Sequence, residues 1–196
     1  MMSAFGLILS LQNGIYKLKC RCFFLRQARA AAMELYEQNL DVTELVGWVK
    51  RQRVMMFPAL LYLFVRAAEE GEGRLLCPCY TVLDEKKGGS SWLFNACRGN
   101  FDDFYREYVS AWHRFSESGE TVQNPPLPEE CLYVSCLAAW GLREEFAKDG
   151  LFLALGKLFE DGGRFYIPLT IKNAGRSADL FERLQDSCRE CIKKGM

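Results

Sequence analysis

His113 is the only histidine in the 196-residue chain, so it supplies the only imidazole available for acid–base chemistry. It falls in a predicted helix, where it shares one face with Arg106 and Ser110, opposite a stripe of aromatic side chains. A polar helix face of this kind points to solvent. The residue types therefore favour a surface histidine, and the alternative interpretation of His113 is a catalytic base.

Nine cysteines are the other reactive side chains, and six of them form close pairs. A Cys-x-Cys pair on a strand, or a Cys-x-x-Cys pair on a helix, places both thiols on one face. A zinc site needs about four converging ligands, usually from knuckles with Cys-x₂₋₄-Cys spacing in loops. We predict no metal site and no required cofactor, and interpret the thiols as core side chains, with metal or redox use as the alternative. The pairs are Cys20 and Cys22, Cys77 and Cys79, and Cys188 and Cys191.

Three further features resemble parts of active sites but have simpler interpretations. Asp179 falls in the first turn of the last predicted helix, where a carboxylate complements the helix dipole. Gly162-Gly163 is predicted to be a turn and not a phosphate-binding loop. Ser135 lies on a predicted strand with no base within reach in the sequence, so we assign it no catalytic role.

The elements that would position these residues follow from hydrophobic periodicity and from capping signals. Helices are expected over residues 23–38, after a cap at Asp41 or Thr43, from Phe57-Pro58, after a cap at Asn100, and after a cap at Ser177. Residues 116–130 are expected to be a loop. Strands are expected as a pair turning at Asn13-Gly14, and over Leu75–Leu83, Cys131–Leu137, Leu151–Phe159 and Arg164–Lys172, the last two joined through Glu160-Asp161-Gly162-Gly163.

Three of these helices carry apolar side chains at helical spacing, which predicts the faces that they bury. The helix that opens at Phe57-Pro58 is apolar nearly all round and is expected to be buried. The inward side chains are Leu45, Val46, Trp48 and Val49; then Phe101, Phe104, Tyr105, Tyr108, Trp112 and Phe115; and in the last helix Leu180, Phe181, Leu184, Cys188 and Cys191.

The mixture of helices and strands predicts an α/β fold, a two-layer sandwich in which a mixed β-sheet packs against helices, formed as one domain over residues 1–196. Lysine plus arginine and aspartate plus glutamate number 25 each, and this balance argues against nucleic acid as a partner. The longest apolar run, Val54–Val65, is shorter than the about 20 residues of a membrane span. Unpaired thiols without a secretory leader favour a cytoplasmic protein.

Several segments, taken together and in order, resemble the chloramphenicol acetyltransferases. The match covers about 160 residues, whereas residues 1–35 match poorly. It runs through Tyr36–Thr43, Phe57-Pro58-Ala59, "CPCYTV" (77–82), "NFDDFYREY" (100–108), "YVSCLAAW" (133–140), "LALGKLFEDGGRFYIPLTI" (153–171) and "LFERLQDSCRE" (180–190).

The resemblance implies a trimer of α/β sandwich subunits that transfers an acetyl group from acetyl-CoA to a hydroxyl of the antibiotic, in active sites between subunits. In that family a histidine of a His-His-x-x-x-Asp-Gly motif is the general base, and a serine two residues after the matching tryptophan donates to the oxyanion. This chain has Asn173-Ala174-Gly175-Arg176 in place of the motif and Leu142 in place of the serine. Its connector is also about five residues shorter, and a hairpin of the family is reduced to Glu72-Gly73-Arg74.

A general base contributes about 10²–10⁴-fold to a rate, and one oxyanion donor about 10²–10³-fold. We therefore expect a catalytically inactive relative that keeps the fold for assembly or for binding a small molecule, and that forms a homo-oligomer, a trimer by resemblance. The alternative is an acetyl-CoA-dependent O-acetyltransferase that uses a substitute base, for which His113 is the one imidazole. Acetyl-CoA is a possible co-substrate by the same resemblance.

Overall fold

The computed structural model describes residues 35–84, 89–97, 99–119, 127–141, 150–172 and 176–190. The chain divides into two compact units, Met1–Glu34 and Leu35–Met196, and all described residues belong to the second. The predicted strand pair at Asn13-Gly14 and the first part of the predicted helix over 23–38 lie outside the described residues. A single domain over residues 1–196 stays a prediction.

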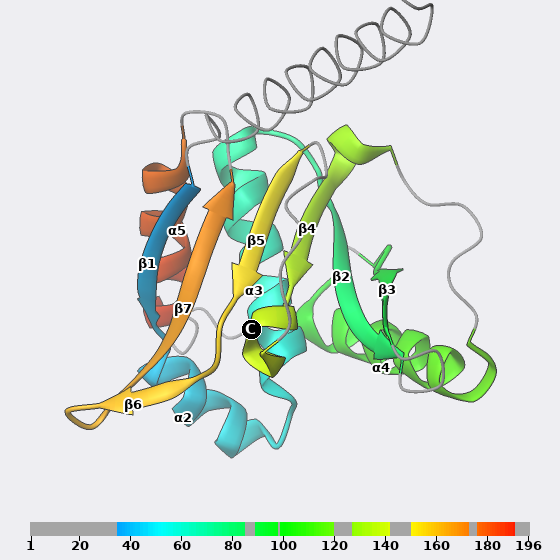
Figure 1. Ribbon diagram of the computed structural model, residues 1–196, viewed down its shortest axis with the longest axis horizontal. Coiled ribbons are helices and arrows are strands. Elements are labelled where there is room, and N and C mark those ends of the chain that lie inside the picture. Colours follow the sequence, from blue (N-terminus) through cyan, green and yellow to red (C-terminus); the bar gives the residue numbers. More distant parts are fainter. Residues whose placement is uncertain are drawn as a thin grey trace, which may run out of the picture. The chain divides into compact units, whose positions relative to one another are not determined.

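The described residues form a mixed seven-stranded sheet with the order β1-β7-β5-β4-β2-β3, and β6 pairs with β7 (Figure 1). The central pairs β2–β4 and β4–β5 are parallel, and the outer pairs are antiparallel. The strands are β1 (Leu35–Asp41), β2 (Cys77–Asp84), β3 (Gly89–Phe94), β4 (Cys131–Ser135), β5 (Leu151–Leu155), β6 (Phe159–Asp161) and β7 (Arg164–Lys172).

Helices pack against one face of this sheet, so the predicted α/β class and its mixed sheet are confirmed. Figure 1 shows α3 and α5 behind the strands, and α5 contacts β1 and β7 while α3 contacts β2 and β4. The α-helices are α2 (Thr43–Gln52), α3 (Met56–Glu72), α4 (Phe101–Ser118) and α5 (Ser177–Glu190), with short 3₁₀ helices η1 (Pro128–Glu130) and η2 (Leu137–Trp140).

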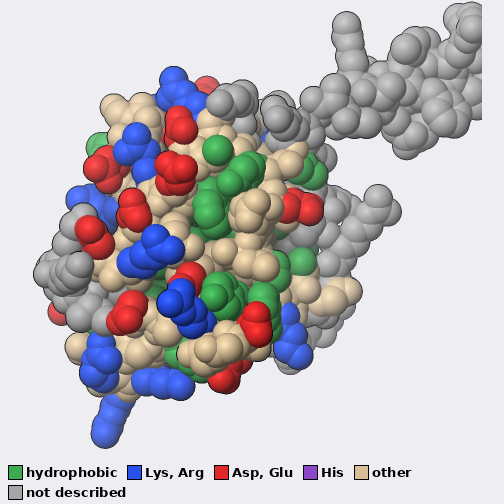
Figure 2. Space-filling view, turned by 90° about the vertical axis from the view of Figure 1, so that its left-hand side faces the viewer, with side chains coloured by type: hydrophobic (Ala, Val, Ile, Leu, Met, Phe, Trp, Pro, Cys, Tyr) green, Lys and Arg blue, Asp and Glu red, His purple; other side chains and the backbone are tan. Residues whose placement is uncertain are grey.

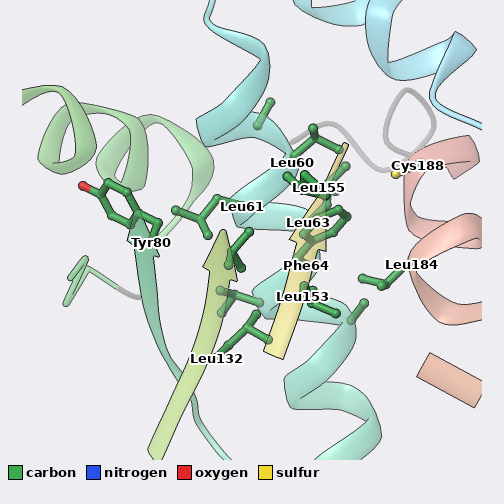
Figure 3. Close-up of a cluster of buried hydrophobic side chains, with 14 of the residues drawn as sticks. Leu60, Leu61, Leu63, Phe64, Tyr80, Leu132, Leu153, Leu155, Leu184 and Cys188 are labelled. Carbon is green, nitrogen blue, oxygen red and sulfur yellow. The ribbon is translucent and has the colours of Figure 1, made fainter. Parts of the chain in front are cut away.

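The main core lies between the sheet and α3, as Figure 3 shows. Alternate residues of β5, Leu151, Leu153 and Leu155, belong to this core, as strand geometry requires. The sequence predicts that helix α3 is buried, and nine of its 17 residues are buried. Each fully buried leucine contributes about 1.5–3 kcal/mol to folding, so this layer dominates the stability of the domain.

Gln185 ties the last helix to the first described strand. Its side-chain amide nitrogen donates to the Asp41 carbonyl at 2.9 Å, and the Asp41 backbone N–H donates to its Oε1 at 3.1 Å. The side chain is buried, and the two hydrogen bonds satisfy it. The pair connects residues 144 positions apart, so this contact helps to hold the two ends of the described chain together.

The helix predicted over 23–38 is wrong for residues 35–38, which belong to β1. Tyr36 pairs with Ile171 and Gln38 with Leu169, in the antiparallel ladder with β7. Most side chains of β1 are exposed, with Leu40 the buried exception. The strand therefore shows little of the alternation that marks a half-buried strand in a sequence, and its pairing with β7 overrides the local helix propensity.

The aromatic stripe of α4 is confirmed for Phe101, Phe104, Tyr108 and Phe115, which are buried. Trp112 is the error, because 44% of it is exposed. Ala111 is buried instead, so the inner face of the helix is rotated slightly from the predicted stripe. The helix also continues to Ser118, into the segment predicted to be a loop, and ends at Gly119 with φ +72°.

Strand boundaries differ from the predictions where the chain turns. Strand β4 stops at Ser135 and continues as η2, and the strand predicted over Leu151–Phe159 is two strands, β5 and β6, separated at Gly156. The hairpin between β6 and β7 is confirmed, with Gly162 and Gly163 at φ +57° and +78°. Strand β3 was not predicted, because its residues carry a weak apolar signal.

The predicted caps are confirmed to within one residue. Asn100 accepts a hydrogen bond from the Asp103 N–H at 3.0 Å, as expected. Val42 occupies the cap position of α2, but the Asp41 carboxylate accepts from the Thr43 N–H at 3.1 Å. Ser177 is the first residue of α5, so the predicted cap lies one residue too late.

The surface over β1 and α5 carries charges of both signs. Figure 2 shows lysine, arginine, aspartate and glutamate side chains interspersed on this side, which agrees with the balanced composition. None of the helices that the structure describes is long and apolar enough to cross a bilayer.

Candidate functional site

The two positions at which an acetyltransferase would keep its base and its oxyanion donor are flanked by described residues at opposite ends of the sheet. The base-bearing connector would follow Lys172 at the end of β7, and Lys172 lies opposite Phe152, near the start of β5. The serine would follow η2, which comes after the carboxyl end of β4. Lys172 lies level with Phe152 and Ser135 lies level with Ala154, so about 7 Å along the strands separates the last paired residues of the two flanks.

Figure 1 shows the same arrangement, with β7 ending at the top of the sheet and β4 ending below. In the described residues, the chain therefore leaves β7 and β4 at different ends of the sheet. Leu142 and residues 173–175 lie outside the described residues.

The carboxyl end of β4 holds a small buried group of hydroxyls. The hydroxyls of Thr81 and Ser135 lie 3.3 Å apart, and both residues are buried. The Cys136 N–H donates to the Thr81 hydroxyl at 3.1 Å, and the Leu137 N–H donates to the Ser135 hydroxyl at 3.4 Å. These contacts are those of a structural cluster that fixes the turn from β4 into η2. They agree with our interpretation of Ser135, and Thr81 was missed because a lone threonine in a strand gives no signal.

A cavity of ≈ 160 Å³ lies between α3 and the start of α5. Its charged lining has two arginines and two acids, so it favours neither an anion nor a cation. It is also smaller than the about 300–1,000 Å³ of usual small-molecule pockets. The lining residues are Ala68, Gly71, Glu72, Arg176, Asp179, Leu180 and Arg183.

His113 lies on the exposed face of α4, as predicted, together with Arg106 and Ser110. Its ring lies 5.4 Å from that of Trp112, and its carbonyl accepts from the Ser116 hydroxyl at 2.9 Å. Among the element pairs in extensive contact, α4 packs against α3 alone. Within the described residues, no carboxylate orients its imidazole, which is the usual support of a catalytic base.

Asp179 lies exposed in the first turn of α5, where the helix dipole favours a carboxylate, as predicted. The thiols of Cys77 and Cys79 lie on one strand, but Cys20, Cys22 and Cys191 lie outside the described residues. Across the ranges given above, no group of three or more His, Cys, Asp and Glu side chains is arranged to hold a metal ion.

The structure adds Cys131 to the thiols of β2, because β2 and β4 pair with Cys77 opposite Cys131. Burial raises the pKa of the Cys79 thiol, and hydrogen bonds with the Cys77 and Cys131 thiols add to the shift. Burial likewise raises the pKa of Cys131. Sequence spacing could not reveal this neighbour, since the two strands are far apart in the chain.

The chain is similar in sequence to chloramphenicol acetyltransferases. That of Bacillus pumilus is 23% identical over 81% of this chain and 85% of its own length. That of Campylobacter coli is 26% identical over 80% of this chain and 84% of its own length. No family model matches the chain.

Solved structures share the fold. A chloramphenicol acetyltransferase superposes with a TM-score of 0.57 at 16% identity, covering 79% of this chain and 87% of its own. The dihydrolipoamide acetyltransferase of Azotobacter vinelandii superposes with a TM-score of 0.64 at 15% identity, and the superposition covers 86% of this chain and 90% of its own. The fold is thus that of the acetyltransferase cores. In sequence and in fold, the chain is therefore similar to the chloramphenicol acetyltransferases.

Proposed function

We propose that this chain is a catalytically silent relative of the chloramphenicol acetyltransferases, which keeps the acetyltransferase fold for assembly or for binding a small molecule. The observation that carries the proposal is the replacement of the histidine motif by Asn173-Ala174-Gly175-Arg176, together with Leu142 at the serine position. Without a base and an oxyanion donor, proximity is the main remaining source of rate.

The direct test is a thiol-release assay with acetyl-CoA and chloramphenicol, in which the Bacillus pumilus relative serves as the active control. We expect no release of CoA above the uncatalysed rate. Turnover of even a few per second would overturn the proposal.

The alternative is an acetyl-CoA-dependent O-acetyltransferase with a substitute base, and His113 is the only imidazole that could serve. If turnover is found, His113→Ala should abolish it. Activity that survives the change would show that the base lies elsewhere. The exposed position of His113 on α4 supports the inactive relative over this alternative.

Binding of acetyl-CoA or CoA is a separate question, because a fold can keep a binding site after its chemistry is lost. A ligand that binds only the folded state raises apparent stability by about 2.7 kcal/mol at 100 times its Kd. Melting the protein with increasing CoA, against adenosine as a matched control, tests whether CoA binding remains. If CoA does not change the melting temperature, CoA binding has been lost, and assembly is the role for which the fold is kept.

The proposed assembly is a homotrimer in the cytoplasm. The resemblance to a family of trimers supports it, because this chain shares their fold. Light scattering at micromolar concentration should give three times the 22.5 kDa of the chain. A mass near 22.5 kDa would mean that the changes in this chain removed the interface along with the chemistry.

A further inference from the structure

Three cysteines lie together on the face of β2 and β4 that is turned away from the main core. Cys77 pairs directly with Cys131 across the parallel ladder, and Cys79 lies two residues further along β2, on the same face. Cys79 and Cys131 are buried in a small apolar cluster with Tyr133, Phe152 and Ala154, and Cys77 packs at its margin. All three are present as thiols.

Strand geometry selects one pair of these thiols for a covalent bond. Directly opposite residues on neighbouring strands lie about 4.8 Å apart, inside the 4.4–6.8 Å range of Cα separations that a disulfide spans. Cys77 and Cys131 are such a pair. The backbones of Cys79 and Cys131 lie on a diagonal of about 7–8 Å, at or beyond the limit, although their two thiols hydrogen-bond with each other.

Burial decides which thiol an oxidant meets first. Cys77 is half-buried, whereas Cys79 and Cys131 are buried. Burial also raises the pKa of the Cys79 and Cys131 thiols, so neither is the first thiolate that a peroxide meets. A small oxidant thus reaches Cys77 first, and Cys131 stands directly opposite.

We propose that Cys77 and Cys131 are a modification site, at which a peroxide oxidises the chain to a reversible disulfide between β2 and β4. The Cys77 thiolate attacks the peroxide, an S–O bond forms, the O–O bond breaks, and the leaving oxygen takes up a proton. The Cys131 sulfur then attacks the sulfenic acid, the S–S bond forms, and hydroxide leaves as water after protonation. With hydrogen peroxide, two thiols lose two electrons and two waters form, and a reducing thiol reverses the reaction.

The disulfide would join the amino-terminal ends of β2 and β4 and enclose β3 and α4 in a covalent loop. Such a link restricts the unfolded chain, so the oxidised protein should melt at a higher temperature than the reduced protein. Because Cys131 also has a raised pKa, the rate of closure should increase as the pH rises.

The test uses the full, reduced chain treated with hydrogen peroxide, then alkylated and mapped by mass spectrometry. We expect two fewer alkylated thiols, a loss of two hydrogens, and a peptide that links Cys77 to Cys131. Linkage to another cysteine would overturn the proposal. So would oxidation of Cys77 to sulfinic acid without a link, or thiols at both positions that stay open to alkylation after unfolding.

Two variants give the matched comparison. In Cys131→Ser, Cys77 should remain as a sulfenic acid that a 1,3-diketone reagent traps, and no link should form. Cys97→Ser removes another half-buried cysteine and should leave the Cys77–Cys131 link intact. The map of the unaltered chain decides the question even if Cys131→Ser fails to fold.

Discussion

The hydroxyl of Tyr80 is a buried polar group with no hydrogen-bond partner in the described part of the chain. Its ring packs 5.0 Å from the ring of Tyr108 and 5.9 Å from that of Phe57, and burial raises the pKa of the phenol. An unpaired buried hydroxyl costs about 1–3 kcal/mol. The hydroxyl of Tyr80 therefore destabilises the folded protein, while the packing of its ring stabilises it.

Tyr80→Phe should stabilise the protein by about 1 kcal/mol, because the ring contacts remain and the unpaired hydroxyl is removed. Thermal melting should show an increase of about 2–4 °C. Tyr133→Phe is the matched control, since the Tyr133 hydroxyl hydrogen-bonds with the Cys131 thiol. That variant should not gain stability, and equal gains in both would contradict the assignment.

Asp41 is a residue whose charge stabilises the fold. Burial alone would raise its pKa, but the Thr43 hydroxyl and N–H, with Arg164 and Arg189, together hold the pKa below the ordinary 3.8. The Thr43 hydroxyl donates to it at 2.6 Å, and Arg164 lies 3.5 Å from its other oxygen. A lowered pKa means that the folded state favours the ionised carboxylate.

Asp41→Asn should destabilise the protein at neutral pH, because asparagine keeps a capping oxygen but loses the charge. The stabilisation is fully present above the unfolded-state pKa and is lost as the pH falls through the lower folded-state pKa. We expect urea unfolding to give a constant difference in the free energy of unfolding between the unaltered protein and Asp41→Asn from pH 7 downward. This difference should begin to decrease near pH 4. A difference that widens toward acid would contradict this account.

At the scale of elements, close backbone approach limits what the connections tolerate. Gly156 ends β5 where the chain turns toward β6, and its N–H donates to the Pro168 carbonyl at 2.8 Å. A Cβ added there would lie 2.9 Å from the Pro168 Cβ, on a rigid ring of the neighbouring strand. This contact explains why the long strand predicted over Leu151–Phe159 is divided.

Gly156→Ala should cost about 1–3 kcal/mol, because either Pro168 or the turn must move. Gly47→Ala is the matched control within α2. There the nearest atom to an added Cβ is the flexible end of Arg51 at 3.3 Å, and alanine should gain about 0.5–1 kcal/mol in a helix interior. Chemical denaturation should show a lower free energy of unfolding for Gly156→Ala and a higher one for Gly47→Ala. A Gly156→Ala variant as stable as the unaltered protein would refute the close approach of Gly156 to Pro168.

Helix α4 gives a second comparison, between two aromatic residues one turn apart. Phe115 is 6% exposed and Trp112 is 44% exposed. Phe115→Ala should therefore cost about 3–5 kcal/mol, whereas Trp112→Ala should cost less than about 1 kcal/mol. Denaturant midpoints of the two variants test the orientation of the helix, and large losses of similar size in both would mean that the predicted stripe, with both side chains inward, was right.

At the scale of the molecule, the sequence predicts the fold class because most elements carry their own local signals. Asn100 and the apolar run of α3 predict helices, and Gly162-Gly163 predicts a hairpin. Strand β1 could not be predicted, since its exposed side chains carry no alternation and its existence depends on pairing with β7.

For the candidate site too, some features can be predicted from the sequence and others cannot. Residue types alone show that the chain has no His-His-x-x-x-Asp-Gly motif, because that is a matter of identity. The separation of the two flanks depends on the register of β7 on β5, and the position of Cys131 beside Cys77 depends on the register of β2 on β4. Such registers are non-local, so no window of the sequence contains them.

The pairing of β1 with β7 also sets an order of events during synthesis. Tyr36 and its neighbours leave the ribosome well before their partners around Ile171, which are made 135 residues later. Until then one edge of β1 has no strand beside it, and the Gln185 contact to Asp41 is also absent. Unpaired strands of this kind expose the nascent chain to aggregation and slow its folding. The growing polypeptide is therefore expected to depend on chaperones until β7 and Gln185 have emerged, whether or not the finished protein catalyses anything.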